Sequence, residues 1–442
     1  MNALILSCGG SPEPLIFCIN NFKPDFTYFL CSNDSIDIAN DIAIECSLKD
    51  NQFNVKVVKN HESLEDCFAK SREIIKELEK DYDNIHVDFT GGTKPMVSGL
   101  VLAAIGEDCT YSYVGSKDSA ARDKNGLGVV QNGFELIKDQ RDPYDVFAVM
   151  EFNKGMDFFN KYQFEAARVN FKQASEKLES QDLKELSELY IELVDVYDKW
   201  DKFNNVKGKK LTLDYLLSQI LDKINNSDNL KNHLDKNYPN FTFQMENNIE
   251  FLKLKISSKG KLKQKNVKYY LPDLLNNAYR RIEEGKYDDA IARLYRSIEL
   301  IAQYSLTNEH VVNEDNLQKN KEFSINVIDV DALYDANVND VLSNFMDYQK
   351  AKLKGRKTFR IGLKNSYQLL ESMGSEYAKD YLNDVEIEKN LRLRNRSILA
   401  HGLQPIDGQV ANRLYSQVLS YAKRAFPDIV KYMNMADFPK FE

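Results

Sequence analysis

Two glycine pairs in the first quarter of the chain can bring backbone N–H groups close to an anionic ligand. The first lies in SCGGSPEP at residues 7–14, and the second lies in VDFTGGTKPM at residues 87–96, where Lys94 adds a positive charge. Glycine permits positive φ and lets a ligand approach the backbone. A helix that follows such a loop presents the positive end of its dipole. Either loop alone is explained as well by an ordinary turn, but two on one edge predict a phosphate-bearing ligand.

The kind of ligand is narrowed by patterns that are missing. The ATP-binding pattern GxxxxGK[ST] needs Ser or Thr after its lysine, but Lys94 is followed by Pro95. The dinucleotide pattern GxGxxG is missing too. A nucleotide held mainly by backbone groups and threonine hydroxyls fits the two segments better.

A second group of chemically capable residues lies in EIEKNLRLRNRSILAHGLQP, residues 386–405. At 100° per residue, a helix places Arg394 and His401 on one face, beside an apolar stripe that includes Leu391. Histidine transfers protons near neutral pH, and arginine stabilises phosphate charge. The pair indicates metal-independent cleavage of RNA, with the 2′-hydroxyl as internal nucleophile.

The elements that must position the glycine pairs are alternating strands and helices. Apolar runs predict strands at 3–8, 26–32, 54–60, 84–91 and 109–115. Helical patterns separate them at 13–22, 34–48, 63–81 and 93–107. This alternation predicts a mostly parallel, Rossmann-like sheet, whose ligands bind beyond the carboxyl ends of the strands. A late hairpin is expected at 126–137, with Asn132-Gly133 as its turn.

Glycines and β-branched runs become sparse after residue 142, and amphipathic helices take over. Helix pairs are expected at 155–178 and at 277–306, the second with a turn at Gly285. We therefore predict a multidomain chain, with an α/β Rossmann-like domain followed by an all-α connector and an all-α C-terminal domain. The expected boundaries are 1–142, 143–268 and 269–442, and the basic segment 257–268 is expected to be a loop or linker.

Bulk composition sets broad limits. The chain has 442 residues and a net charge of −8, which argues against a protein that is basic all over and coats nucleic acid. We expect a cytoplasmic protein that does not bind a membrane, because we find neither a basic leader nor an apolar stretch of spanning length. The six cysteines show no metal-ligand spacing and are expected to be buried and reduced.

VDFTGGTKPM resembles the DxTGGTKxM signature of CARF domains, with SCGGSPEP as the companion loop, and the resemblance covers residues 1–142. It implies a sensor that binds cyclic oligoadenylate across a two-fold dimer interface. The ligand-binding residues it implies are Gly9, Gly10, Ser11, Thr90, Gly91, Gly92, Thr93, Lys94 and Met96.

RNRSILAHG resembles the R-x4-6-H motif of HEPN ribonuclease domains in two possible registers. Arg394 leaves six intervening residues before His401, and Arg396 leaves four. The family pattern has a polar residue after the arginine, so Asn395 favours the first register. The implied catalytic residues are Arg394, Asn395 and His401.

The two motifs together resemble the ancillary endoribonucleases of type III CRISPR systems. The resemblance implies a homodimer that cuts single-stranded RNA, leaves 2′,3′-cyclic phosphate and 5′-hydroxyl ends, and needs neither a metal nor another cofactor. It favours cyclic hexa-adenylate over tetra-adenylate as activator, and no stable DNA binding is expected.

The CARF domain could also cleave the activator, through Thr90, Thr93 or Lys94. The alternative is a nucleotide-responsive regulator or scaffold without nuclease activity. The basic segment 350–360 could guide RNA, or it could be a solvated loop.

Overall fold

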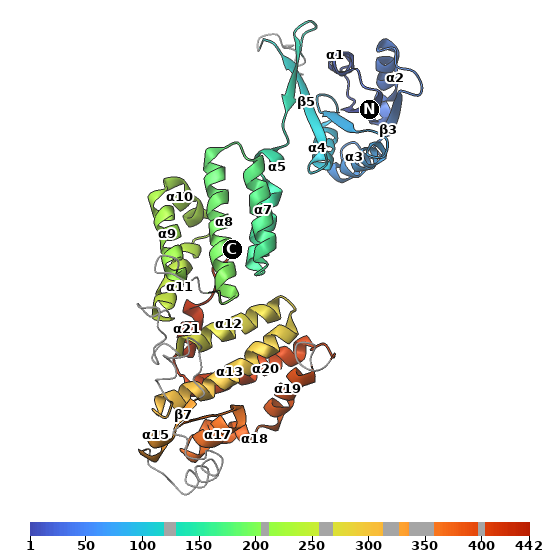
Figure 1. Ribbon diagram of the computed structural model, residues 1–442. Coiled ribbons are helices and arrows are strands. Elements are labelled where there is room, and N and C mark those ends of the chain that lie inside the picture. Colours follow the sequence, from blue (N-terminus) through green and yellow to red (C-terminus); the bar gives the residue numbers. More distant parts are fainter. Residues whose placement is uncertain (119–129, 205–211, 256–267, 313–326, 336–357, 397–402) are drawn as a thin grey trace. The chain divides into compact units, whose positions relative to one another are not determined.

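The computed structural model describes residues 1–118, 130–204, 212–255, 268–312, 327–335, 358–396 and 403–442 (Figure 1). The chain divides into two compact units. The first comprises Met1–Glu151 with Ala174–Leu183, and the second comprises Phe152–Gln173 with Lys184–Glu442. Within the described ranges, none of the helices combines the length and the apolar character that crossing a membrane requires.

The first unit is built on a six-stranded sheet in the order β3-β2-β1-β4-β5-β6. Its strands are β1 (Asn2–Ser7), β2 (Phe26–Cys31), β3 (Phe53–Val57), β4 (Asn84–Asp88), β5 (Cys109–Ser116) and β6 (Glu135–Gln140). All neighbouring strands pair in parallel except β5 and β6, which are antiparallel. The strand order reverses between β1 and β4, and this switch point is where such sheets bind ligands. The predicted Rossmann-like fold is confirmed.

Helices cover both faces of this sheet. They are α1 (Glu13–Phe22), η1 (Asn33–Ser35), α2 (Ile36–Glu45), α3 (Leu64–Leu78) and α4 (Lys94–Ala104). Successive residues of a strand point to opposite faces. Ala3 and Ile5 of β1 accordingly pack with α3 and α4, whereas Leu4 and Leu6 pack with α1 and α2.

The expected late hairpin is only partly correct. The turn exists, because the Phe134 N–H bonds to the Gln131 carbonyl at 3.1 Å and Gly133 has φ of +89°. However, β6 begins only at Glu135 and pairs with β5. Residues 126–129 of the expected hairpin lie outside the described residues.

Helices make up most of the remaining chain. From Pro143 onward they are α5 (Pro143–Val146), α6 (Val149–Asn160), α7 (Phe164–Lys177), α8 (Gln181–Asp201), α9 (Leu213–Asn226), α10 (Asp228–Asn237) and α11 (Phe241–Lys255). The expected helix pair at 155–178 is confirmed by α6 and α7. The basic segment 257–268 lies, apart from its last residue, outside the described residues.

The C-terminal helices are α12 (Tyr270–Glu283), α13 (Tyr287–Asn308), α15 (Val330–Asp335), α17 (Leu363–Ser372), α18 (Glu376–Asn383), α19 (Val385–Arg396), α20 (Gly408–Ala425) and α21 (Ile429–Met435). Gly285, with φ of +71°, forms the expected turn between α12 and α13. An antiparallel pair of short strands, β7 (Val327–Asp329) and β8 (Thr358–Arg360), was not expected. The last three residues of the basic segment 350–360 form β8, and the others lie outside the described residues.

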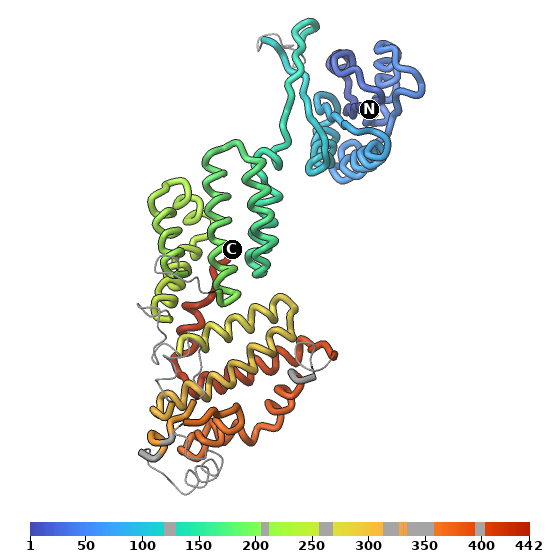
Figure 2. The backbone as a smooth tube through the Cα atoms, viewed as in Figure 1, coloured from blue at the N-terminus to red at the C-terminus, as the bar shows by residue number. Residues whose placement is uncertain are grey.

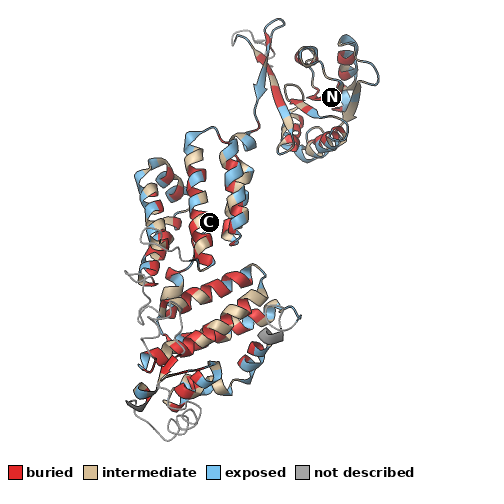
Figure 3. Ribbon diagram, in the orientation of Figure 1, coloured by how far each residue is buried: buried red, intermediate tan, exposed pale blue. Residues whose placement is uncertain are grey.

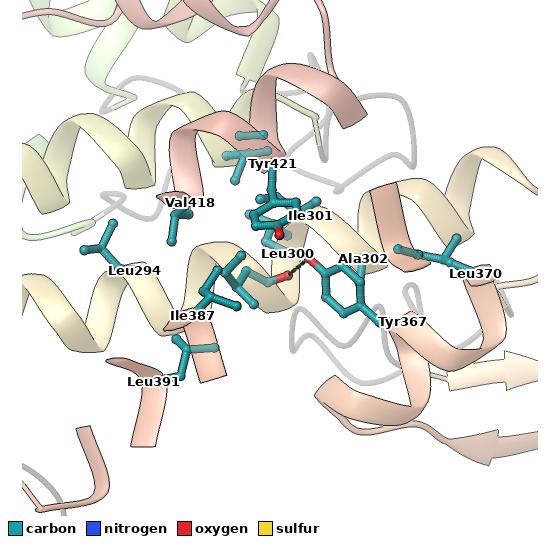
Figure 4. Packing of buried hydrophobic residues seen from close by; sticks show 14 of the residues in the cluster. Leu294, Leu300, Ile301, Ala302, Tyr367, Leu370, Ile387, Leu391, Val418 and Tyr421 are labelled. Atoms are coloured by element: carbon teal, nitrogen blue, oxygen red, sulfur yellow. Dashed lines mark hydrogen bonds between the residues drawn. The ribbon is translucent and has the colours of Figure 1, made fainter. Parts of the chain in front are cut away.

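One large apolar core holds the C-terminal helices together. Buried side chains form stripes along α12 and α13 (Figure 3). Figure 4 shows how residues of α13, α17, α19 and α20 meet in this core. Tyr367 of α17 is fully buried there and donates a hydrogen bond of 3.1 Å to the Ile298 carbonyl.

The last residues of the chain pack among the helices α6 to α11 (Figure 2). The Phe441 ring lies 4.7 Å from the rings of both Tyr190 and Phe241. Phe438 lies 4.8 Å from the Tyr197 ring and 5.0 Å from the Trp200 ring. The chain therefore returns from the C-terminal helices to complete the core of the connecting helices, which the predicted boundaries do not describe.

Candidate functional site

The two glycine loops leave adjacent strands of the sheet. The first follows β1 and contains Gly9, Gly10 and Ser11 before α1 begins at Glu13. The second follows β4 and runs from Phe89 to Thr93 before α4 begins at Lys94. Because β1 and β4 are paired in parallel, both loops emerge at the same edge. Their expected placement on one edge is thus confirmed.

The loops are in direct contact. A Cβ atom added to Gly9 would lie 2.6 Å from the Gly92 nitrogen, and one added to Gly91 would lie 2.6 Å from the Ser7 carbonyl oxygen. The Ser7 hydroxyl donates a hydrogen bond to the Gly91 carbonyl. Gly92 has φ of +95°, which favours glycine. Glycine is therefore needed here for close approach of two backbones, in addition to any role in ligand binding.

The two threonine hydroxyls hold the second loop in place. Thr90 Oγ1 accepts a hydrogen bond of 2.7 Å from the Val114 N–H of β5. Thr93 Oγ1 donates to the His61 carbonyl at 2.8 Å and caps α4 by accepting from the Met96 N–H at 3.4 Å. Thr93 thus uses its hydroxyl proton within the protein, whereas Thr90 accepts a hydrogen bond and keeps its proton, so the expectation that threonine hydroxyls share ligand binding stays a prediction.

The remaining expected ligand residues differ in exposure. Gly10 and Lys94 are exposed, and Ser11 is partly buried. Lys94 stands in the first turn of α4, where the helix dipole is positive, and forms no ion pair with any residue that the structure describes. A cation there is unfavourable unless an anion balances it. The Met96 side chain is fully buried in the core between the sheet and α3 and α4, so it does not reach the loop surface.

A chain of hydrogen-bonded polar groups, of which Asp88 and Ser112 are fully buried, supports the second loop from below. The Thr90 N–H donates to Asp88 Oδ1 at 3.1 Å, and the Ser112 hydroxyl donates to Asp88 Oδ2 at 2.6 Å. His86 contacts Ser112 Oγ through Nε2 at 2.9 Å and Thr110 Oγ1 through Nδ1 at 2.7 Å. The one hydroxyl proton of Ser112 goes to Asp88, so we assign the proton of the neutral imidazole to Nε2.

Burial shifts the pKa of both ionisable groups in this chain. It lowers the pKa of His86 from 6.5 to about 4 and raises the pKa of Asp88 above its ordinary value. At neutral pH His86 is therefore uncharged, and it can serve as a fixed hydrogen-bonding link.

Sequence reasoning missed Ser7, His86 and Ser112 as parts of this site. A signal was present for the last two. His86 and Asp88 alternate on β4, Thr110 and Ser112 alternate on β5, and the register pairs His86 with Thr110 and Asp88 with Ser112. Polar residues at every second position of two neighbouring strands share one face.

The second motif begins on α19. Ile387, Asn390 and Leu391 of this helix are buried, whereas Glu388 and Arg392 are exposed. The predicted apolar face is thus confirmed for the described part of the helix. Arg394 and Asn395 lie in the last turn of α19, and His401 lies outside the described residues. The position of Arg394 continues the buried face, and that of Arg396 continues the exposed one.

The C-terminal part of the chain matches a known family. Residues 259–425 match the model of the Csm6 HEPN domain. This range contains both registers of the Arg/His motif and ends before the residues that pack among the connecting helices. No curated protein is significantly similar to the chain.

Two solved structures match the chain at low similarity. Enterococcus italicus Csm6 bound to cyclic hexa-2′-fluoro-hexa-dAMP is 13% identical, with a TM-score of 0.47, over 97% of this chain and 95% of that chain. Can2 from Sulfobacillus thermosulfidooxidans in complex with cyclic tetra-adenylate is 11% identical, with a TM-score of 0.23, over 57% of this chain and 67% of that chain. Both TM-scores are too low to carry an argument, so the likeness of the chain to a known family rests on the family match. Over residues 259–425, the C-terminal part of this chain is similar to the Csm6 HEPN domain.

Proposed function

We propose that this chain is a single-strand endoribonuclease of type III CRISPR defence that cyclic oligoadenylate activates. The observation that carries the proposal is the HEPN match, because it covers the one segment in which the sequence places an arginine and a histidine at ribonuclease spacing. The glycine loops at the sheet edge supply a separate place for an activator.

The activator-binding site lies where the two loops meet. Its residues are Gly9, Gly10, Ser11, Thr90, Gly91, Gly92, Thr93 and Lys94, and Met96 contributes through the first turn of α4. Within the protein, each threonine hydroxyl already has a hydrogen-bond partner that shapes the loop. Backbone N–H groups and the Lys94 ammonium would therefore bind the phosphates. Cyclic hexa-adenylate is the preferred activator over tetra-adenylate.

Cleavage would take place between two copies of the HEPN domain in a homodimer. The 2′-oxygen attacks the adjacent phosphorus, the bond to the 5′-oxygen breaks, and the products are a 2′,3′-cyclic phosphate and a 5′-hydroxyl. The 2′-hydroxyl loses one proton and the leaving 5′-oxygen gains one, so the reaction consumes and releases no net proton. His401 serves this proton transfer, Arg394 stabilises the charge of the transition state, and Asn395 orients the pair. No metal takes part in this chemistry.

A second activity, cleavage of the activator by the sensor domain, belongs to the same proposal. Thr93 donates its hydroxyl proton to the His61 carbonyl, and Thr90 accepts from β5. Lys94, exposed and without an ion pair among the described residues, is the best placed of the three expected groups.

The test uses purified full-length protein and labelled single-stranded RNA in EDTA, with and without cyclic hexa-adenylate or tetra-adenylate. We expect cleavage only with activator, and a loss of at least a hundredfold in His401→Ala. Full cleavage by His401→Ala would contradict the catalytic assignment. Activator binding without any RNA cleavage would favour a regulator or scaffold.

A further inference from the structure

A cavity of about 360 Å³ opens beside α19, the helix that carries Arg394. It lies entirely within the C-terminal helices. Its walls include Tyr295 of α13, Lys364 of α17, Tyr381 of α18, and Glu388, Leu391 and Arg392 of α19.

The inner wall of the cavity is largely apolar and includes a packed aromatic ring. The Tyr381 ring is stacked on the fully buried Tyr367 ring, with centroids 3.7 Å apart and planes inclined by 24°. It also meets the Tyr421 ring edge-on at 5.7 Å. Leu391 is buried in the same core (Figure 4). A flat wall with a fixed aromatic ring suits a flat aromatic ligand.

The rim of the cavity carries charges of both signs. Arg392 donates to Glu388 Oε1 at 2.7 Å, with side chains that are 73% and 59% exposed. Such exposed pairs contribute little to stability. Arg392 can therefore turn to a phosphate, and the Glu388 carboxylate has a second oxygen that can accept a hydrogen bond. Lys364 adds another exposed cation.

The cavity is close to the position of the proposed catalytic arginine. Leu391 lines the cavity, and Arg394 follows it by three residues on the same helix. Residues three apart on a helix are surface neighbours, separated by less than one turn of about 5.4 Å. The part of the cavity wall that Leu391 forms is therefore within one helical turn of Arg394, and Glu388 lies six residues, about 9 Å along the helix axis, before Arg394.

We propose that this cavity is a base-binding subsite for the single-stranded RNA substrate, and that it holds a nucleobase with an exocyclic amino group next to the scissile phosphate. Proteins recognise single-stranded RNA by stacking unpaired bases on aromatic rings and by hydrogen bonds to the base edges. Glu388 accepts a hydrogen bond from the amino group, which adenine, cytosine and guanine have and uracil lacks. Arg392 and Lys364 contact the flanking phosphates. This inference rests on the proposed ribonuclease function and adds a source of base preference.

The first test measures base preference with full-length protein and saturating cyclic hexa-adenylate. Each substrate is a DNA strand with one ribonucleotide, because only that residue supplies a 2′-hydroxyl, and the bases on either side of the cut are varied. We expect wild type to prefer an amino-bearing base at one flanking position. Glu388→Gln should reduce that preference at least fivefold. The matched control is Glu386→Gln, on the same helix but exposed and not part of the cavity wall, and it should keep the wild-type preference.

The second test is independent of cleavage. RNA carrying 8-azidoadenosine is irradiated with His401→Ala protein, and the linked peptides are identified by mass spectrometry. We expect crosslinks to the peptides that contain Tyr381 or Glu388, reduced at least fivefold by Glu388→Gln but retained in Glu386→Gln.

The outcomes separate this inference from the proposed function. An unchanged base preference in an active Glu388→Gln enzyme, or crosslinks that avoid both peptides, would overturn the subsite. A wild-type protein that crosslinks as expected but never cuts RNA would contradict the ribonuclease proposal and keep the RNA-binding site. A change in sedimentation mass with unaltered preference would make the cavity an interface between two copies of the chain and would also overturn the subsite.

Discussion

Gly9 and Gly92 bring two loops into such close contact that a Cβ atom added to Gly9 would lie 2.6 Å from the Gly92 nitrogen. The obstacle is backbone, which cannot rotate away as a side chain can. The activator-binding surface that we propose thus depends on the absence of a side chain at Gly9. Gly10, the next residue, has no atom within 4 Å of an added Cβ.

The difference in free space around Gly9 and Gly10 predicts different results when each is changed to alanine. Gly9→Ala should force the loops apart, weaken activator binding at least tenfold and lower stability by about 1–3 kcal/mol. Gly10→Ala should leave stability close to wild type and weaken activator binding less than Gly9→Ala does, because its added methyl group meets no protein atom. Calorimetric titration with cyclic hexa-adenylate and thermal unfolding measure the two effects. Equal affinities for the two variants would show that contact between the loops does not shape the site.

The pKa of His86 predicts a pH dependence with a definite sign. Its pKa is about 4 in the folded protein and 6.5 in the unfolded chain, so the unfolded chain binds an extra proton between these values. The contribution of His86 to stability is therefore complete above pH 6.5 and is lost as the pH falls towards 4, by about 3 kcal/mol. Asp88, whose pKa is raised, acts in the opposite sense, because its contribution is lost as the pH rises through its folded pKa.

NMR titration of the histidine rings should show one midpoint near 4, which disappears in His86→Gln. The unfolding temperature of wild type should also fall more steeply than that of the variant between pH 6.5 and 4. A His86 midpoint near 6.5 would contradict the assignment of a neutral imidazole at neutral pH.

The sheet could be predicted from sequence because buried parallel strands are short apolar runs with helical patterns between them. The β6 strand was placed wrongly for a physical reason. Asn132-Gly133 signals a turn locally, but the partner strand is chosen by long-range register, and β6 pairs with β5. The contact of Ser112 with Asp88 could not be predicted for the same reason, because this contact depends on the pairing of β4 with β5.

The glycine loops were recognisable because glycine pairs after strands are uncommon without a structural need. The hydrogen bonds of Thr90 and Thr93 within the protein could not be recognised from the sequence. A hydroxyl in a loop looks the same in sequence whether it binds a ligand or a neighbouring strand. The return of Phe438 and Phe441 to distant helices leaves no periodic signal at all.

The contacts of Phe441 predict that the last residues stabilise the connecting helices. Phe441 is 7% exposed, and Asn160 holds its backbone through both side-chain atoms, at 2.9 Å and 3.1 Å. Phe441→Ala should lower stability by about 3–5 kcal/mol, as buried aromatic truncations do. Lys440→Ala, an exposed neighbour, should change it by less than about 0.5 kcal/mol. Hydrogen exchange of peptides from α8 and α11 reports the effect, and equal protection in the two variants would argue against this role.

The two registers of the catalytic motif predict different mutants. Position 394 continues the face of α19 on which Ile387 and Leu391 are buried, whereas position 396 lies about 200° away, on the side of exposed Arg392. A residue that acts in a composite site between two HEPN copies needs the sheltered border of that apolar face, because charge stabilisation is strongest where water is excluded.

Arg394→Ala should therefore lower the activator-stimulated rate constant for RNA cleavage by about 100-fold to 1000-fold. Arg396→Ala should change it only a few fold, mainly through weaker RNA binding. This difference from wild type should shrink as the salt concentration rises, because the variant makes fewer phosphate contacts and its binding depends less on salt. Single-turnover cleavage at two salt concentrations separates these effects, and unchanged affinity for cyclic hexa-adenylate in both variants shows that the sensor is intact. A severe loss in Arg396→Ala with near-normal Arg394→Ala would assign the motif to the register with four intervening residues.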